Sequence, residues 1–319
     1  MGEQDDFLGQ VATVARRHGV GPGEVREVPG GVANRGFVLG EQLFLRVSRP
    51  GYEDDLRKEI HVVPAARSVG VLTPAIVEYD AGRQLIDAPY VVMEQVHGTE
   101  PTEVPAGLAE QLARLHQIEQ PGPAALPEVE EDGWGDPWRT IEDLADRGFI
   151  DPGTATWLSG WFTRLAERVD AGGPKVLIHG DVAAHNLLAG PGNDLRALID
   201  WGDAAWAPPA MDFAKLPLTQ VAALLPAYQH HLRSPAATRR TSPTVHTAAS
   251  ASARTAGSSD SEHELAAAIL WFHLSWALAK LPAAPWPNQR HWTAPTTSRL
   301  LGLLQFFTTT PPAPWGDLV

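Results

Sequence analysis

The sequence predicts an α+β fold of two lobes, with a small antiparallel sheet in the first lobe and mainly helices in the larger second lobe. Short strand-like segments separated by glycine-containing turns fill residues 1–97. Amphipathic segments with helical spacing dominate residues 98–319. The content of 44% hydrophobic and 20% charged residues is typical of a globular chain with a sizeable core. We therefore predict an N-terminal lobe over residues 1–97, ending in a hinge at 93–97, and a C-terminal lobe over residues 98–319.

Two helices and several strands are predicted in the first lobe. Apolar residues recur at helical spacing in residues 5–18, and residues 53–69 begin with acidic side chains that favour a helix N-terminus. Pro64 interrupts this second helix. The predicted strands are residues 25–28, 36–39, 42–47, 75–79, 84–86 and 90–96.

The second lobe is predicted to be mostly helical, with three short strands in its middle part. The predicted helices are residues 108–118, 154–169, 220–232, 264–281 and 297–307. The predicted strands are residues 176–178, 187–188 and 195–199. Residues Ser234–Glu262 consist mainly of Ser, Thr and Ala and contain no aromatic residue, Leu or Ile. Such a segment buries too little apolar surface to offset its ordering entropy, so we predict a disordered insertion there.

Charge and composition exclude several classes of protein. The formal net charge of −13 argues against a nucleic-acid partner, whose phosphates need Lys and Arg. The same charge fits either attraction of a cationic small substrate or solubility alone. Cysteine is absent, which rules out disulfides and thiolate metal sites. No run of about 18 apolar residues predicts a membrane span, and the acidic N-terminus lacks a signal-like apolar core. We expect a cytoplasmic protein with no membrane partner.

The segment from Leu177 to Asp203 carries the chemistry. An apolar strand precedes Asp181, Asn186 opens a second strand, and Asp200 ends a third. The turn at residues 190–193 joins the second and third strands into a hairpin, which brings Asn186 and Asp200 to one edge.

These three residue types suit phosphoryl transfer. Divalent metal must neutralise the charge spread over the transferred group, and Mg²⁺ prefers oxygen ligands such as carboxylates, phosphate oxygens and water. Asp200 and the amide oxygen of Asn186 can supply protein ligands. A further carboxylate must orient the attacking hydroxyl and accept its proton, and Asp181 is placed for that role.

The block His179-Gly180-Asp181-x4-Asn186, followed by Ile199-Asp200-Trp201, resembles the aminoglycoside phosphotransferase family and its choline and homoserine kinase relatives. It is similar to the catalytic loop and the metal-binding Asp of protein kinases. The resemblance implies a bilobal, protein-kinase-like fold, Asp181 as catalytic base, and Asn186 and Asp200 as magnesium ligands. It implies that His179 supports the loop by hydrogen bonds and that Asp212, in Met211-Asp212-Phe213-Ala214, is a helix cap or loop support.

Other segments match the family in the same order along the chain. Residues 30–34 resemble its nucleotide loop, which implies Gly31 and Asn34 as nucleotide contacts. Phe44-Leu45-Arg46-Val47 resembles the strand whose cation contacts the phosphates, with Arg46 where many kinases have Lys. Glu59 is the implied partner of Arg46. Residues 90–98 resemble the hinge, where Met93 would be the gatekeeper and the Glu94 carbonyl and Val96 amide would meet the purine.

The acceptor site is less defined. Asp203 fits either a contact with a cationic substrate or a structural role in its loop. Trp271 and Trp276 fall in a helix that lines the acceptor site in the family, and core packing is the alternative for both. His116 and His185 are predicted to be structural.

The expected activity is transfer of the γ-phosphate of ATP or GTP, with Mg²⁺, to a hydroxyl of a small molecule. An antibiotic of the aminoglycoside, peptide or nucleoside type is the leading acceptor class, which would confer resistance. A metabolic kinase acting on a sugar, amino alcohol or nucleoside is the alternative. A catalytically inactive nucleotide-binding module is disfavoured by the presence of Asp181, Asn186 and Asp200.

Overall fold

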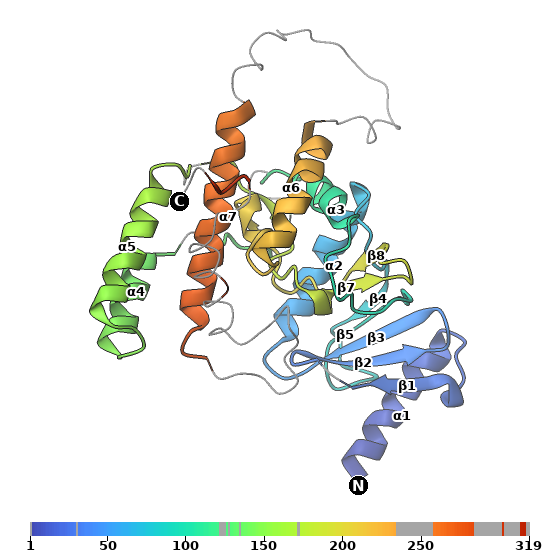
Figure 1. Cartoon of the computed structure of the whole chain (residues 1–319). Helices are drawn as coiled ribbons and strands as arrows, with labels where there is room; N and C mark the ends of the chain where they lie inside the picture. The colour runs from blue at the N-terminus through green and yellow to red at the C-terminus, as the bar shows by residue number, and fades with distance from the viewer. Residues whose placement is uncertain are drawn as a thin grey trace. The chain divides into compact units, whose positions relative to one another are not determined.

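The chain folds into two compact units in a computed structural model, shown in Figure 1. The structure describes residues 2–29, 31–120, 126, 128–133, 135–170, 173–233, 258–283, 302 and 313–316. The first unit comprises residues 1–107, 121–130 and 185–205. The second comprises residues 108–120, 131–184 and 206–319. The division differs from the predicted lobes mainly in residues 185–205, which belong with the N-terminal sheet.

The first unit is built on a five-stranded antiparallel sheet with the order β1-β2-β3-β5-β4 (Figure 1). Its strands are β1 (Val25–Val28), β2 (Asn34–Leu39), β3 (Leu43–Ser48), β4 (Ile76–Asp80) and β5 (Tyr90–Glu94). The 3₁₀ turn η1 (Pro22–Glu24) precedes β1. This sheet followed by a mainly helical region confirms the predicted α+β class.

The predicted strand at residues 84–86 is wrong, because residues 81–89 form a loop. The Asp80 side chain accepts a hydrogen bond from the Gly82 amide at 2.6 Å, and Arg83 adopts a positive φ of 53°. These features turn the chain away from an extended path. The apolar Ile86 is nevertheless buried, because it packs in the core beside the sheet.

Two helices cover the two faces of this sheet. Helix α1 (Gly2–Arg17) contributes Val11, Val14 and Ala15 to a core that contains alternate residues of β2, β3 and β5, among them Phe37 and Leu45. Helix α2 (Glu53–Ser68) packs its Leu56 against Val91 and Met93, which point to the other face of β5. Pro64 lies inside α2, and the helix continues through it to Ser68.

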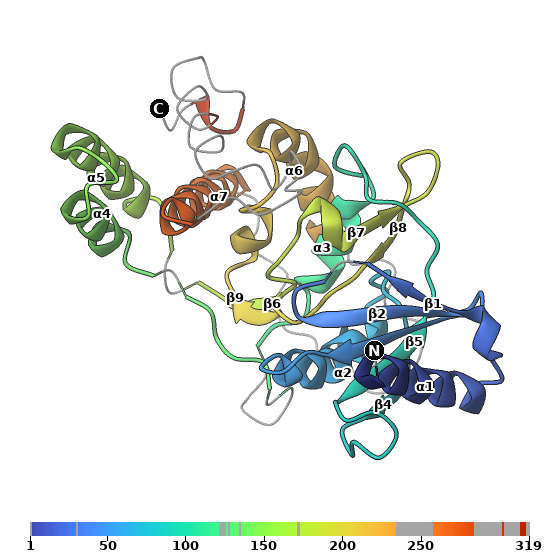
Figure 2. The same cartoon turned by 90° about the horizontal axis from the view of Figure 1, so that it is seen from below.

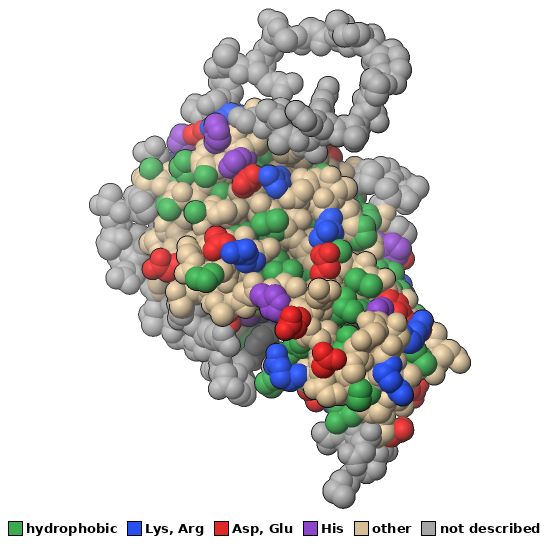
Figure 3. Space-filling model, turned by 90° about the vertical axis from the view of Figure 1, so that its right-hand side faces the viewer, with side chains coloured by type: hydrophobic (Ala, Val, Ile, Leu, Met, Phe, Trp, Pro, Cys, Tyr) green, Lys and Arg blue, Asp and Glu red, His purple; other side chains and the backbone are tan. Residues whose placement is uncertain are grey.

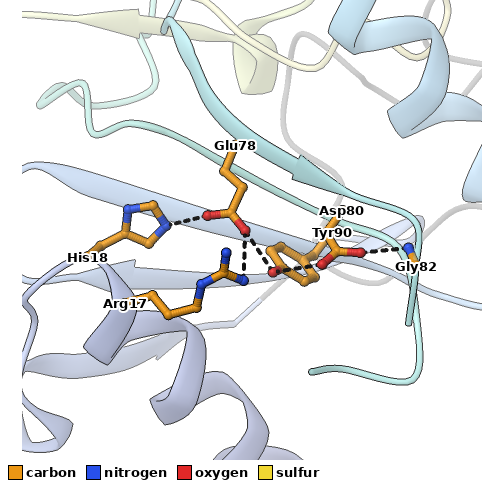
Figure 4. Close-up of polar contacts among 6 residues, drawn as sticks. All are labelled: Arg17, His18, Glu78, Asp80, Gly82 and Tyr90. Carbon is orange, nitrogen blue, oxygen red and sulfur yellow. Dashed lines mark hydrogen bonds and ion pairs between the residues drawn. The ribbon is translucent and has the colours of Figure 1, made fainter. Parts of the chain in front are cut away.

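A polar cluster joins α1 to the sheet, as Figure 4 shows. Glu78 of β4 accepts hydrogen bonds at 2.9 Å from the Tyr90 hydroxyl and pairs with Arg17 at 3.2 Å. His18 Nε2 lies 2.9 Å from the other Glu78 oxygen. Burial and the neighbouring Glu78 raise the pKa of Tyr90 well above its ordinary value, so that its hydroxyl stays a donor. One carboxylate therefore takes three partners, two from the C-terminal end of α1 and the residue that follows it, and one from β5.

The hairpin of β7 (Leu187–Ala189) and β8 (Leu195–Leu198) completes the first unit. The Leu198 amide donates to the Leu72 carbonyl at 2.8 Å, and Thr99 forms a bridge with Ala189. The buried indole of Trp201 donates to Thr73 Oγ1 at 2.9 Å. These bonds to residues of the N-terminal part explain why residues 185–205 belong to this unit.

The second unit is mainly helical (Figure 2). Its helices are α3 (Leu108–Leu115), α4 (Pro137–Asp146), α5 (Pro152–Ala166), α6 (Leu218–Arg233) and α7 (Ser258–Lys280). The short strands β6 (Val176–Ile178) and β9 (Ala205–Ala207) pair with each other. Two 3₁₀ turns complete the list of elements, η2 (Ala184–Asn186) and η3 (Pro209–Phe213).

Helix α4 was not predicted, although its start is encoded locally. Asp136 accepts a hydrogen bond from the Arg139 amide at 3.0 Å, and Pro137 is the first helical residue. Asp151 and Pro152 begin α5 in the same way. An Asp-Pro pair before a periodic apolar pattern is therefore the signal that would have found α4.

The predicted insertion is only partly open to comparison. Residues 234–257 lie outside the described residues, and so does the predicted helix 297–307 apart from Gly302. Helix α7 begins at Ser258, before the predicted end of the insertion at Glu262. Helical backbone hydrogen bonds extend the apolar α7 toward its N-terminus despite the polar composition of residues 258–262.

The described helices and the face drawn in Figure 3 can be compared with the features of membrane-spanning and nucleic-acid-binding proteins. None of the described helices has the length and apolar content needed to cross a membrane. On the face shown in Figure 3, Lys and Arg side chains lie interspersed with Asp and Glu side chains. This face carries no continuous basic surface of the kind that binds phosphate backbones.

A buried network in the second unit holds the loop after β6. Asp212 of η3 accepts hydrogen bonds from the amides of His179 at 2.9 Å and Gly180 at 2.8 Å. Its Oδ2 also lies 3.0 Å from His116 Nε2, and His116 Nδ1 lies 2.7 Å from the Tyr228 hydroxyl. The carboxylate accepts only, so His116 carries its proton on Nε2. The predicted structural role of His116 agrees with this geometry.

The charge of Asp212 is stabilised by its partners. Burial alone would raise the pKa of its carboxyl, but the hydrogen bond from His116 and the donors at His179 outweigh burial and lower the pKa below its ordinary value. Asp212 is 1% exposed, so its charge depends on these donors rather than on water.

We predict that Asp212→Ala lowers the free energy of unfolding by about 3 kcal/mol, because it leaves buried donors without an acceptor. Urea unfolding measures this loss, and Asp146→Ala, at an exposed aspartate of α4, should change stability by less than about 0.5 kcal/mol. Since the pKa of Asp212 is lowered on folding, the wild-type advantage is complete above the ordinary value of 3.8 and declines as pH falls through the lowered value. A difference that instead shrinks between pH 5 and 8 would contradict this account.

We predict that Glu78→Ala destabilises the protein by about 1 to 2 kcal/mol, because three donors lose their shared acceptor. Thermal or urea unfolding provides the measurement. Glu41→Ala, at an exposed glutamate of the β2–β3 turn, is the matched control. Equal stability of the two variants would show that the cluster contributes nothing.

Candidate functional site

A pocket of about 550 Å³ lies within the first unit, in the size range of small-molecule sites. Its walls come from the loop before β2, from strands β2 and β3, from the segment after β5 and from the β7–β8 hairpin. Of the residues singled out from the sequence, those in its wall are Gly31, Asn34, Arg46, Met93, Glu94, Val96, Asn186 and Asp200. The tertiary structure thus brings eight predicted residues from three separate segments to one cavity.

The loop before β2 reaches the pocket through a constrained backbone. Gly31 has a φ of +80°, and a Cβ at this position would lie 2.5 Å from the Asn34 carbonyl oxygen. A side chain is excluded there on both counts. Asn34 is 6% exposed, and its Oδ1 lacks a hydrogen-bond partner among the described residues. A buried acceptor in a pocket wall is suited to a ligand donor or a bound water.

Arg46 is held between two carboxylates. Its Nη1 donates to both oxygens of Glu59 at 2.8 and 2.7 Å, and its Nη2 donates to Asp200 Oδ1 at 2.6 Å. The predicted pairing of Arg46 with Glu59 is therefore confirmed, and Asp200 is a second partner that was not predicted. Burial alone would lower the pKa of Arg46, but Glu59 and Asp200 outweigh it and raise the pKa, so the cation is retained.

Asp200 occupies an uncommon backbone conformation. Its φ is +67°, in the left-handed region that non-glycine residues rarely adopt. On one side, the Ile199 amide donates to the Asn186 carbonyl at 3.0 Å, and on the other side Trp201 is fixed to Thr73. Neighbouring bonds therefore enforce this conformation, as is common at functional sites. The predicted hairpin does bring Asn186 and Asp200 to one edge.

The hinge segment is fixed by its own hydrogen bonds. The Glu94 amide donates to the Ala75 carbonyl at 2.9 Å, and the Ala75 amide donates back to Glu94 Oε2 at 2.9 Å. Met93 is 6% exposed and lies in the pocket wall. These two hydrogen bonds hold Glu94 in place at the edge of the pocket, and Val96, two residues later, also lines the pocket.

Phe44 is a pocket residue that the sequence reasoning missed. It pairs with Met93 across β3 and β5, and its ring lies 2.7 Å from where a Cβ on Gly36 would be. Strand periodicity contains the signal, because Phe44 and Arg46 are two positions apart and face the same side of β3. His185, predicted to be structural, is exposed and also lines the pocket.

Asp203 lies near two other carboxylates of the first unit, those of Asp55 and Asp200. Burial and the charges of Asp203 and Asp200 raise the pKa of Asp55, which places these three carboxylates in one neighbourhood. A Cβ on Gly202 would lie 3.0 Å from the Asp55 Cβ, so the chain passes Asp55 closely. Asp203 itself is exposed.

Asp181 belongs to the second unit and comes directly after His179 and Gly180, whose amides Asp212 binds. His179 is fully buried, Gly180 adopts a φ of +81°, and the Asp181 amide donates to His179 Nδ1 at 3.3 Å. Lys215 Nζ lies 2.5 Å from Asp181 Oδ1. The predicted supporting role of His179 fits this geometry, whereas no local signal pointed to Lys215, which lies 34 positions away.

The two tryptophans of α7 lie in different environments. Trp271 is 5% exposed, and its ring centroid lies 4.9 Å from Phe162 and 5.7 Å from Trp138 in edge-to-face contacts. This burial favours core packing over substrate contact for Trp271. Trp276 is half-buried.

The residues present fit a magnesium ion that is bound together with phosphate. No group of three or more His, Cys, Asp or Glu able to hold a metal was found in the described part of the chain. Asn186 and Asp200 offer one amide and one carboxylate oxygen in the same pocket wall, and the Asp200 side chain is 48% exposed. Mg²⁺ commonly takes one or two carboxylates and fills its remaining positions with phosphate oxygens and water.

Comparison with solved structures agrees with the architecture. The wild-type aminoglycoside 2'-phosphotransferase IIIa in complex with GDP aligns with a TM-score of 0.58 at 18% identity, covering 88% of this chain and 93% of that one. The ADP-bound aminoglycoside phosphotransferase APH(2'')-Ib aligns at 0.57 and 14% identity, covering 92% and 97%. The macrolide 2'-phosphotransferase MphH from Brachybacterium faecium aligns at 0.55 and 18% identity, covering 88% and 99%. These likenesses confirm the predicted kinase-like fold.

Sequence comparison establishes the family. No curated protein matches the sequence significantly. The model of the phosphotransferase enzyme family matches residues 24–243, which include the pocket of the first unit and the Asp181 loop of the second. More than half of the chain is matched, and the chain therefore belongs to the phosphotransferase enzyme family.

Proposed function

We propose that this protein transfers the γ-phosphoryl group of ATP or GTP to a hydroxyl group of a small molecule, with an antibiotic as the favoured acceptor. The observation that carries the proposal is the pocket wall in which Arg46, Asn186 and Asp200 come together beside the hinge. This combination of a cation, two oxygen ligands and an apolar slot suits a metal-bound nucleoside triphosphate.

Different residues of the pocket contact the purine and the phosphates of the nucleotide in this proposal. Phe44 and Met93 supply apolar surface for the purine, while the Glu94 carbonyl and the Val96 amide supply its hydrogen bonds. Gly31 lets the loop backbone approach the phosphates, and Arg46 offsets their charge. The unpaired Oδ1 of Asn34 accepts a hydrogen bond from a donor group of the nucleotide or from a bound water. Backbone contacts suit either purine, so ATP and GTP both remain donors in this proposal.

Asn186 and Asp200 would hold the magnesium ion, which when bound neutralises charge on the transferred group. Arg46 orients Asp200 through the 2.6 Å bond to Oδ1, and Glu59 in turn orients Arg46. Asp181 orients the acceptor hydroxyl and accepts its proton as the new oxygen–phosphorus bond forms. The bond between the γ-phosphorus and the bridging oxygen breaks, and the nucleoside diphosphate leaves.

Two lines of support favour an antibiotic acceptor. The solved structures that share this fold, at 14–18% identity, are phosphotransferases of aminoglycosides and of a macrolide, which makes an antibiotic the acceptor to test first. The net charge of −13 favours a cationic acceptor through long-range attraction. A phosphoryl group on a drug hydroxyl adds bulk and negative charge where the drug contacts its target.

We predict that purified protein phosphorylates at least one member of a panel of aminoglycosides, macrolides, peptide antibiotics and nucleoside antibiotics. Mass spectrometry would detect a gain of one phosphoryl group, and a host expressing the protein would tolerate that compound. Sugars, amino alcohols and nucleosides form the second arm of the panel. Phosphorylation confined to that arm would replace the resistance role with a metabolic one.

We predict that Asp181→Asn reduces kcat by at least about 100-fold, because the proton acceptor is lost. Nucleotide affinity should change by less than about threefold, since the proposed nucleotide contacts are unaffected. Asp170→Asn, in the same unit and outside the Asp181 loop, is the control and should keep full activity. Equal kcat for wild type and Asp181→Asn would overturn the assignment of the base.

We predict that Arg46→Lys raises the nucleotide KM by roughly tenfold, because one ammonium cannot reproduce the two-sided contacts of the guanidinium with Glu59 and Asp200. Steady-state kinetics at varied nucleotide concentration provides the measurement. Arg57→Lys, on the exposed side of α2, should leave KM unchanged. An unchanged KM for Arg46→Lys would remove Arg46 from the nucleotide site.

A further inference from the structure

Lys215 contacts the carboxylate to which the proposed function assigns the proton transfer. Its ammonium lies 2.5 Å from Asp181 Oδ1 and 3.4 Å from the Gly180 carbonyl oxygen. The two side chains are 21% and 19% exposed, so the ion pair is mostly removed from solvent. All of these groups belong to the second unit, so the contact is internal to one compact body.

The backbone around Lys215 is fixed. Phe213 and Leu216, which flank it at short range, are buried, and the Leu216 amide donates to the Phe213 carbonyl at 3.1 Å. Asp212, three residues earlier, accepts the amides of His179 and Gly180. The segment from Asp212 to Lys215 thus holds the backbone of the Asp181 loop through Asp212. It holds the Asp181 side chain through Lys215.

Stability alone is a weak reason for this ion pair. Partly exposed ion pairs usually contribute about 0–1 kcal/mol. Asp212 already fixes the backbone of the loop with two hydrogen bonds, one buried and one partly buried. The Lys215 contact therefore adds mainly control over the direction and charge of the Asp181 carboxylate.

Such control matters for the proposed reaction. The ammonium contacts Oδ1 of the Asp181 carboxylate, and this contact fixes the orientation in which the carboxylate meets an acceptor hydroxyl. A free carboxylate rotates between several orientations, and loss of alignment in a reacting pair lowers the rate without weakening binding. The ammonium also offsets the repulsion between the carboxylate and a negatively charged phosphoryl group.

We propose that Lys215 is a positioning residue for phosphoryl transfer, acting through Asp181. The Lys215 side chain holds Asp181 Oδ1 while the proton of the acceptor hydroxyl moves to the Asp181 carboxylate. The acceptor oxygen bonds to the γ-phosphorus, and the nucleoside diphosphate leaves with the electron pair of the broken bond. This inference rests on the proposed function and adds a residue that the catalytic motif does not contain.

The test compares Lys215→Met, Lys215→Arg, Asp181→Asn and the double variant Lys215→Met/Asp181→Asn. The assay uses an acceptor identified in the panel, and nucleotide hydrolysis with water as acceptor serves as the second assay. Lys175→Met removes the ammonium of another ion pair of the same unit, with Glu131, and is the matched control. Nucleotide binding and circular dichroism verify that each variant is folded.

We expect Lys215→Met to lower kcat by roughly 10- to 100-fold with nucleotide KM changed by less than about twofold. Lys215→Arg, which keeps the charge, should recover most of the lost rate. In the Asp181→Asn background, Lys215→Met should have no further effect, because the group through which Lys215 acts is gone. Lys175→Met should retain the wild-type kcat.

Several outcomes would overturn the inference. An active wild type with an unchanged kcat for folded Lys215→Met refutes the role of Lys215 and leaves the proposed function intact. An equal loss in the wild-type and Asp181→Asn backgrounds shows that Lys215 does not act through Asp181. A loss for Lys215→Met matched by an equal loss for Lys215→Arg also counts against it. A wild type that transfers no phosphoryl group to any acceptor or to water overturns the proposed function and this inference together.

Discussion

The guanidinium of Arg46, whose side chain is 11% exposed, is the constraint on which the pocket of the first unit depends. A cation removed from water needs opposite charges and hydrogen-bond acceptors, and here Glu59 of α2 and Asp200 after β8 supply both. The bonds tie β3, α2 and the hairpin into one structure around the pocket. Loss of either carboxylate would leave the guanidinium partly unpaired and would break the tie between Arg46 and the segment that carried this carboxylate.

A comparable arrangement organises the second unit around Asp181. Asp212 is buried and anionic, and it accepts the amides of the loop while His116 and Tyr228 complete the network behind it. Lys215, from the same segment, contacts the Asp181 side chain. Backbone and side chain of the loop are thus held by separate interactions, which is what a geometrically demanding proton transfer requires.

Much of the fold and of the site was predictable because it follows local rules. Alternating residues predicted the strands of the first unit, glycine turns separated them, and the hairpin geometry brought Asn186 and Asp200 to one edge. The misses have particular causes. Residues 84–86 are apolar because Ile86 packs in the core, not because they form a strand. Helix α4 has a periodic apolar pattern that includes Ile141 and Leu144, but this pattern and its Asp-Pro start were overlooked.

The sequence by itself determined the family and the class of fold. Its signals lie in residues that are close together in the sequence. They are the spacing of Asp181, Asn186 and Asp200, the strand pattern, and the pair of Arg46 and Glu59, which are 13 positions apart. Only the tertiary structure decided the contacts of Arg46 with Asp200, 154 positions apart, and of Lys215 with Asp181, 34 positions apart. Periodicity states which face a side chain occupies. Which distant side chain meets it depends on how the elements pack, and no local pattern encodes that.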